Sequence, residues 1–129
     1  MDPQQELFTE ILKILINLFG RENVYDGWLP GEKAAYPFVY IADSSMTDQP
    51  NKSAVFGEVT QTVHVWHDDP HKRGTVSAMM LQIKQRMRTL EKTDNFGWIL
   101  TGVSQQILPD DSTNTPLLHG ILELRLKFS

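Results

Sequence analysis

The stretch LLHGILELRLKF (117–128), close to the C-terminus, alternates apolar and polar side chains, most regularly from Leu122 to Phe128. Alternation of this kind predicts a β-strand with one buried face and one solvated face. The apolar side chains on one face are Leu118, Leu122, Leu124, Leu126 and Phe128, and the polar ones opposite are His119, Glu123, Arg125 and Lys127. The fold must therefore contain a sheet and a second apolar layer that covers one side of it.

Other segments supply both requirements. Strands are predicted at 38–42 (FVYIA), 58–67 (EVTQTVHVWH) and 98–108 (WILTGVSQQIL), with a short extended piece at 24–25. A helix is predicted from about residue 3 to 19, between Pro3 and Gly20, and a second begins near Thr75. Consecutive end strands and a separate central helix indicate one domain, 1–129. Its predicted fold class is α+β, with two main helices packed on one face of a mostly antiparallel sheet of four to five strands.

The two helices differ in their apolar side chains. The first has one stripe at Leu7, Ile11, Ile14, Leu15 and Leu18 and a second at Phe8, Leu12, Ile16 and Phe19. This is more apolar surface than one core contact requires, so the helix either sinks deeply into its own core or also meets a neighbouring subunit. The second helix carries Val76, Met79, Met80, Ile83, Met87 and Leu90 at spacings of three and four. We expect this methionine stripe to pack against the final strand.

The stretch DSSMTDQPNKSAVFG (43–57) is polar and shows little periodicity. It is long for a structureless connection in a compact domain, which leaves a hairpin arm or a functional mobile segment. Its few apolar residues are Met46, Val55 and Phe56. We expect a mobile loop here that becomes ordered on assembly.

Composition excludes several classes of protein. There is no cysteine, so disulfides, thiolate zinc sites and cysteine nucleophiles are ruled out. The formal net charge is −4, with 16 acidic against 12 basic residues, which argues against a general nucleic-acid binder. The N-terminal stretch lacks a basic segment, and Glu10, Lys13 and Asn17 interrupt its apolar run. We therefore expect a soluble, intracellular chain with neither signal peptide nor membrane span.

The stretch VHVWHDDPHKRG (63–74) contains three of the four histidines. His64 and His67 are three residues apart on one strand, so their side chains leave opposite faces of the sheet. His67, Asp68 and His71 have the side chains of metal ligands but not the usual spacing. The acids and Pro70 are better explained as the end of the strand. No nucleophile elbow, P-loop or dinucleotide fingerprint occurs. We expect no bound metal, no cofactor and no catalytic residue.

The order of motifs resembles a known family. A helix leads into VYDGWLPGEKAAYPFVYIAD (24–43), then a polar stretch, then TVHVWHDDPHKRG (62–74) and a Met-rich helix that ends in MRTL (87–90). Over about residues 7 to 128 this is similar to the tail terminator, or tail completion, proteins of long-tailed bacteriophages. The sequence departs from the family pattern at His67, where a Ser or similar residue often follows the Trp.

The resemblance implies a structural virion protein, made in the bacterial host cytoplasm. Such a protein forms a six-membered ring that caps the tail tube, stops its growth and joins the tail to the head connector. Its partners would be further copies of the chain, the tail tube protein and a connector or stopper protein. DNA would pass through the channel without specific binding, in keeping with the acidic charge. The residues expected at interfaces are Trp28, Met46, Val55, Phe56, Phe8 and Phe19.

Two rival functions remain open at this point. The first is a small monomeric adaptor that binds a partner through an edge strand, 117–128. The second is a metal-dependent hydrolase that uses His67, Asp68 and His71.

Overall fold

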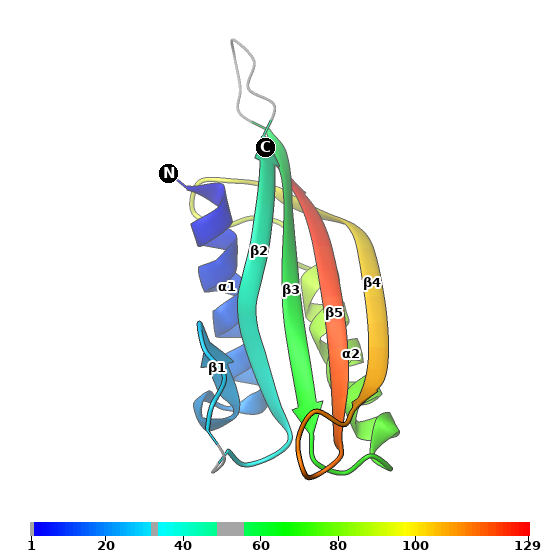
Figure 1. Cartoon of the computed structure of the whole chain (residues 1–129). Helices are drawn as coiled ribbons and strands as arrows, with labels where there is room; N and C mark the ends of the chain where they lie inside the picture. The colour runs from blue at the N-terminus through cyan, green and yellow to red at the C-terminus, as the bar shows by residue number, and fades with distance from the viewer. Residues whose placement is uncertain (1, 32–33, 49–55) are drawn as a thin grey trace.

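The computed structural model describes residues 2–31, 34–48 and 56–129. In chain order its elements are α1 (Pro3–Phe19), the short 3₁₀ helix η1 (Arg21–Asn23), β1 (Val24–Asp26), β2 (Phe38–Asp48), β3 (Gly57–His67), α2 (Arg73–Arg88), β4 (Trp98–Asp110) and β5 (Leu117–Phe128). The strands form one sheet in the order β1-β2-β3-β5-β4, and both helices lie behind it in Figure 1. The predicted α+β class, with both helices on one face, is confirmed.

The centre of the sheet is the antiparallel pair of β3 and β5. Its register runs without a break from Gly57 opposite Phe128 to His67 opposite Leu118. β2 and β4 flank this pair, also antiparallel, and only the short β1 runs parallel to its neighbour. The alternation predicted for 117–128 is confirmed, because its leucines and Phe128 are buried toward the helices.

Local sequence explains both ends of α1. The Asp2 carboxylate accepts a hydrogen bond from the backbone N–H of Gln5 at 3.2 Å, and Pro3 occupies the first helical position. Gly20 ends the helix with φ of 90°, a conformation that favours glycine, and its N–H donates to the carbonyl of Ile16. The first apolar stripe is buried, whereas Phe8 and Phe19 of the second stripe are half-buried at the edge of the core.

Helix α2 begins at Arg73, two residues earlier than predicted, and lies close against β5. The close approach depends on Gly120, where a Cβ atom would lie 2.7 Å from Cγ1 of Val76 and 3.2 Å from the sulfur of Met80. All three methionines of the stripe belong to the buried core together with the leucines of β5. The prediction that the methionine stripe packs against the final strand is confirmed.

The stretch 43–57 is not a loop throughout. Residues 43–48 continue β2, paired with β3, so over these residues the hairpin arm is the alternative that agrees with the structure and the loop does not begin at Asp43. Strand pairing uses backbone N–H and C=O groups, and polar residues carry these groups as well as apolar residues do. A β-bulge between Ile41 and Ser44 bends the strand, and buried Gln61 donates to the Asp43 carbonyl at 2.8 Å. Residues 49–55, including Val55, lie outside the described residues.

The final strand is internal. β5 lies between β3 and β4, so the prediction of 117–128 as an edge strand is wrong. Side-chain alternation reports on the two faces of a strand. It does not show how many strands lie beside it, because neighbouring strands pair through the backbone groups at its two edges. β4, which also contains a bulge between Leu100 and Gly102, forms one margin of the sheet instead. Within the described ranges, no helix is long and apolar enough to cross a membrane.

Truncation of a core side chain tests this packing. Ile83 on α2 and Leu124 on β5 are both fully buried, so Ile83→Ala or Leu124→Ala should lower the free energy of unfolding by about 2–5 kcal/mol. Leu81 is a matched control on the same helix, because it is 45% exposed. Leu81→Ala should cost about 0.5 kcal/mol or less in urea denaturation. Equal losses at positions 81 and 83 would contradict the orientation of α2.

Candidate functional site

The face of the sheet that the helices leave uncovered carries a row of rings. This row, which we call the histidine row, consists of Tyr40 on β2, His64 and Trp66 on β3, and His119 on β5. The rings of Tyr40 and His64 are 5.6 Å apart, and those of His64 and His119 are stacked at 5.1 Å. Trp66 lies almost parallel to His119, with 3.7 Å between ring centroids. The sheet thus holds four polar-tipped rings in contact on its open face.

The two histidines are bonded to each other. Nδ1 of His64 and Nε2 of His119 are 2.8 Å apart, so one nitrogen donates and the other accepts, depending on the tautomers. Burial, with a further contribution from the nearby His64, lowers the pKa of His119 to about 4, and Asp110 acts weakly in the opposite direction. His119 is therefore neutral at pH 7. On the other side, the Asp43 carboxylate lies 3.5 Å from Nε2 of His64.

Trp66 adds an unusual polar group to this row. Its indole N–H is buried and has no hydrogen-bond partner within the described part of the chain. A buried donor without an acceptor costs free energy, so such groups are rare in folded proteins. The histidine row therefore combines stacked rings with a buried donor that has no acceptor among the described residues.

The proposed metal ligands stay apart from this row. His64 and His67 point to opposite faces of the sheet, as predicted from their spacing. Nδ1 of His67 accepts from the backbone N–H of Asp69 at 3.1 Å and lies 3.3 Å from the Asp68 carboxylate. The Asp69 carboxylate accepts from the backbone N–H of His71 at 2.9 Å. These contacts form the turn between β3 and α2. Over residues 2–31, 34–48 and 56–129, no three His, Asp or Glu side chains are grouped to hold a metal ion.

The expected interface residues lie at separate places on the surface. Trp28, which follows β1, is 77% exposed, and Met46 and Phe56 at the other end of the sheet are each 37% exposed. Phe8 and Phe19 are only half-buried on α1. Sequence reasoning missed further exposed apolar side chains, which are Leu29, Leu81, Ile99 and Leu108. The signal that could have found Ile99 is the side-chain alternation of the strand, because a buried Trp98 turns its neighbour Ile99 to the other face.

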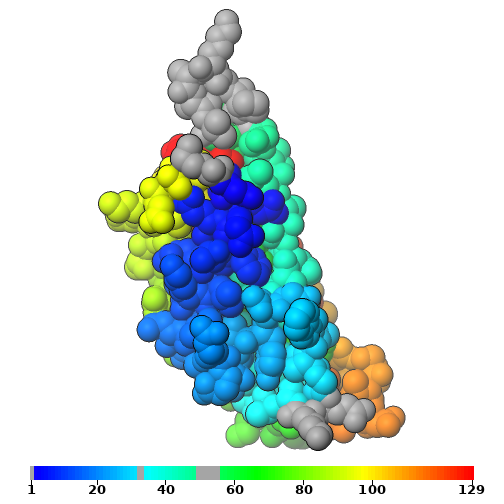
Figure 2. Space-filling view, turned by 90° about the vertical axis from the view of Figure 1, so that its left-hand side faces the viewer, coloured from blue at the N-terminus to red at the C-terminus, as the bar shows by residue number. Residues whose placement is uncertain are grey.

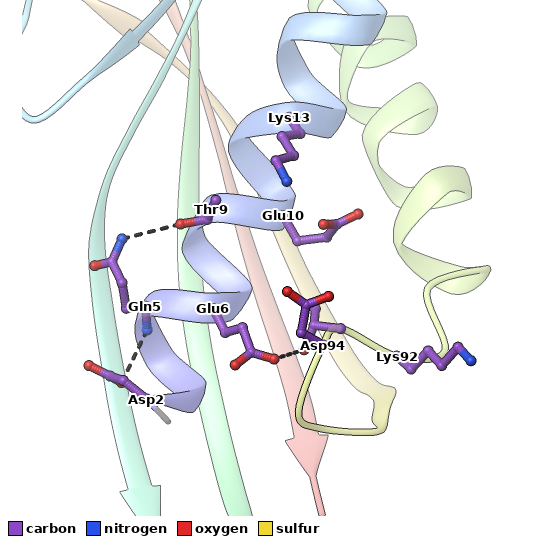
Figure 3. Close-up of a pocket in the computed structure, with 9 residues that line it drawn as sticks. Asp2, Gln5, Glu6, Thr9, Glu10, Lys13, Lys92 and Asp94 are labelled. Carbon is purple, nitrogen blue, oxygen red and sulfur yellow. Dashed lines mark hydrogen bonds between the residues drawn. The ribbon is translucent and has the colours of Figure 1, made fainter.

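A hollow with a volume of about 610 Å³ lies between α1 and the connection from α2 to β4 (Figure 3). Asp2, Glu6, Glu10 and Lys13 from α1 face Lys92 and Asp94 across it. The hollow is open and mixes both signs of charge.

The Glu6 carboxylate in this hollow is already occupied by structural bonds. It accepts hydrogen bonds from the Thr93 hydroxyl at 2.5 Å and from the backbone and side chain of Asn95 at 2.8 and 2.9 Å. These bonds lower its pKa. The Thr93 oxygen in turn accepts from the Trp98 indole at 2.8 Å. Glu6 therefore fastens the connection to α1 and β4, and the hollow gives no sign of a reaction centre.

Comparison with solved structures identifies the fold. A chain in the virion of a native gene transfer agent particle matches with a TM-score of 0.63 at 16% identity, over 97% of this chain and 94% of that chain. The gp17 protein of bacteriophage SPP1 matches with a TM-score of 0.56 at 26% identity, over 95% and 86%. No family model matches the sequence, and no curated protein does. The fold of this chain therefore occurs in phage and virion proteins.

Titration of the histidine row tests its geometry. The pKa of His119 in the folded chain, about 4, lies below its ordinary value of 6.5, so between these pH values the unfolded chain binds more protons. The free energy of unfolding should therefore fall as the pH drops from 6.5 toward 4. His119→Asn should flatten this slope, whereas His71→Asn, at an exposed position, should leave it unchanged. Histidine NMR signals report the pKa directly, and a His119 midpoint near 6.5 would contradict the burial described.

Proposed function

We propose that this chain is a structural virion protein of the tail terminator kind. In this proposal six copies form a ring that caps the tail tube, ends tube growth and joins the tail to the head connector. The observation that carries it is the match to the bacteriophage SPP1 protein, which extends over 95% of this chain at 26% identity. The motif resemblance over residues 7 to 128 rests on the sequence alone and supports the same family.

The distribution of surface features favours assembly over catalysis. Exposed apolar side chains occur at both margins of the sheet, at Trp28 and Leu29 beyond β1 and at Ile99 and Leu108 on β4. A ring subunit needs two different contact surfaces on opposite sides, since head-to-tail contacts close into a ring. We propose that Trp28, Met46, Phe56, Phe8 and Phe19 contribute to contacts with neighbours, with 1–129 acting as one domain.

The partners follow from this role. They are further copies of the chain, the tail tube protein and a head connector or stopper protein, and the protein resides in the virion. With a net charge of −4, the chain favours a channel that DNA crosses without binding. We propose no enzymatic turnover and no cofactor.

An adaptor that binds through a strand edge is the second candidate. Because 117–128 is internal to the sheet, such an adaptor would have to use β4, whose outer edge pairs with no other described strand. Solution mass and tube binding separate the two functions, since an adaptor would bind one partner without a ring.

The decisive experiment adds this protein to polymerising tail tube protein from the same source. Tubes should become shorter and more uniform in length, and electron microscopy should show sixfold density at one tube end. Tube protein alone and tube protein with an unrelated acidic protein of similar size serve as controls. Unchanged tube lengths together with bare ends would refute the tail terminator function.

A further inference from the structure

The two opposite margins of the sheet differ from each other and form complementary surfaces. The β4 margin comprises the outer edge of β4 with Arg88 at the end of α2. The β2 margin comprises the outer edge of β2 over 42–48 with the first turn of α1. We infer that the β4 margin of one copy docks on the β2 margin of the next copy, which extends the sheet from subunit to subunit. This inference rests on the proposed ring and names the surfaces that build it.

The β4 margin has a bulge between Leu100 and Gly102 but lacks the charged side chains that commonly protect an edge strand. Exposed edges generally carry lysines or other charges that prevent pairing with another chain. β4 has no charged residue from Trp98 to Pro109, and Ile99 on it is 69% exposed. Beside its first half lies a hollow of about 380 Å³, lined by Arg88, Leu90, Ile99 and Thr101 among others. This margin is therefore open to another strand.

The β2 margin offers a free strand edge of its own. β1 pairs only with Val39–Ile41, so over 42–48 the strand has β3 as its single described neighbour. A hollow of about 290 Å³ lies between this edge and the start of α1, lined by Asp2, Gln4, Gln5, Phe8, Ala42 and Ser44. Figure 2 shows this side of the molecule, with α1 in front and β2 beside it. The half-buried Phe8 thus borders a hollow at a strand edge.

The charges favour contact between unlike margins over contact between two β2 margins. The β2 margin presents three exposed acids, Asp2, Asp43 and Asp48. The segment 71–92 is basic although the chain is acidic overall. Its bases are Lys72, Arg73, Lys84, Arg86, Arg88 and Lys92, and its single acid is Glu91. Contacts between two β2 margins would bring acids together, whereas head-to-tail contact places Arg88 near acids.

The strand register places the two margins at the same level along the strand direction. Thr47 lies opposite Glu58, Glu58 opposite Lys127, and Lys127 opposite Ile99, so Thr47 and Ile99 occupy one level and the same open face. Rotation about an axis along the strands does not shift a copy along them. Such a rotation therefore brings 98–104 of one copy beside 42–48 of the next. β2 and β4 run in opposite directions, so the new pair is antiparallel, the commoner arrangement in sheets.

The same alignment limits the strand pairing between copies to the upper half of β4. Leu108 lies at the level of His119, Trp66 and Phe38, next to the level at which β1 begins. In the neighbouring copy β1 covers the outer edge of β2 over Val39–Ile41, and the exposed Trp28 and Leu29 follow the far end of β1. The lower half of β4 therefore lies beside β1 of the next copy and not beside β2.

Disulfide trapping tests the docking, because the chain has no cysteine of its own. The Thr47→Cys variant is mixed with the Ile99→Cys variant at high protein concentration under mild oxidation, with and without tail tube protein. We expect the mixed disulfide in several-fold excess over the matched control pair of Thr47→Cys with Leu108→Cys, which places the thiol at the other end of β4. The double variant with both cysteines should give a ladder that ends in a closed six-membered product.

Charge reversal tests the selectivity of the contact. Arg88→Glu in the Ile99→Cys chain should reduce the mixed disulfide several-fold, and Asp2→Arg with Asp48→Arg in the partner should restore it. Arg73→Glu is the matched control, since Arg73 is exposed at the far end of α2 and changes the net charge equally. It should leave the yield unchanged. All positions are exposed, and circular dichroism checks that each variant is folded.

The outcomes separate this inference from the proposed function. A mixed disulfide no more abundant than the control, or an excess of Ile99→Cys homodimers, would overturn the docking of unlike margins. If rings cap tubes but the mixed disulfide stays at the control level, the proposed function stands and this inference fails. If the mixed disulfide dominates while tubes remain uncapped, the margins dock as inferred and the tail terminator role fails.

Discussion

The antiparallel pairing of β3 with β5 is the interaction on which the rest of the structure depends. Side chains alternate along both strands, so their register decides which residues are buried and which form the open face. A slip of one residue would turn Leu122, Leu124 and Leu126 toward solvent and bring Glu123 and Arg125 under α2. The unbroken register from Gly57 to His67 excludes that slip and creates the narrow gap at Gly120 where α2 packs.

The central strand pair of the sheet is regular, and the irregularities of the sheet lie at its margins. β2 and β4 each contain a bulge, at Ile41/Ser44 and at Leu100/Gly102, and each has a stretch of outer edge that pairs with no described strand. Bulges bend and twist a strand, which is why they are common at sheet edges. Here they adjoin the two hollows beside Asp2 and Arg88. The features that bear on assembly are therefore concentrated where the pairing of the sheet stops.

The open face and the margins contribute different chemistry. On the open face, His64 and His119 share one hydrogen bond, an arrangement that requires at least one neutral ring, and the lowered pKa of His119 provides it. At the margins, exposed charges of opposite sign lie on opposite sides. By contrast, the Glu6 carboxylate in the hollow beside α1 holds the connection before β4 through hydrogen bonds to Thr93 and Asn95. These features are in keeping with the proposed structural role.

The sequence by itself determined both helices, four of the strands and the burial of the methionine stripe, because these follow from side-chain periods of 3.6 and 2. It also determined that His64 and His67 leave opposite faces. Only the tertiary structure decided that β5 is internal, that β2 continues through the polar residues 43–48, and that His64 meets His119. These features depend on backbone pairing between segments distant in the chain. The hydrogen-bonding groups of the backbone are the same for every residue except proline, so no side-chain pattern records which strands they join.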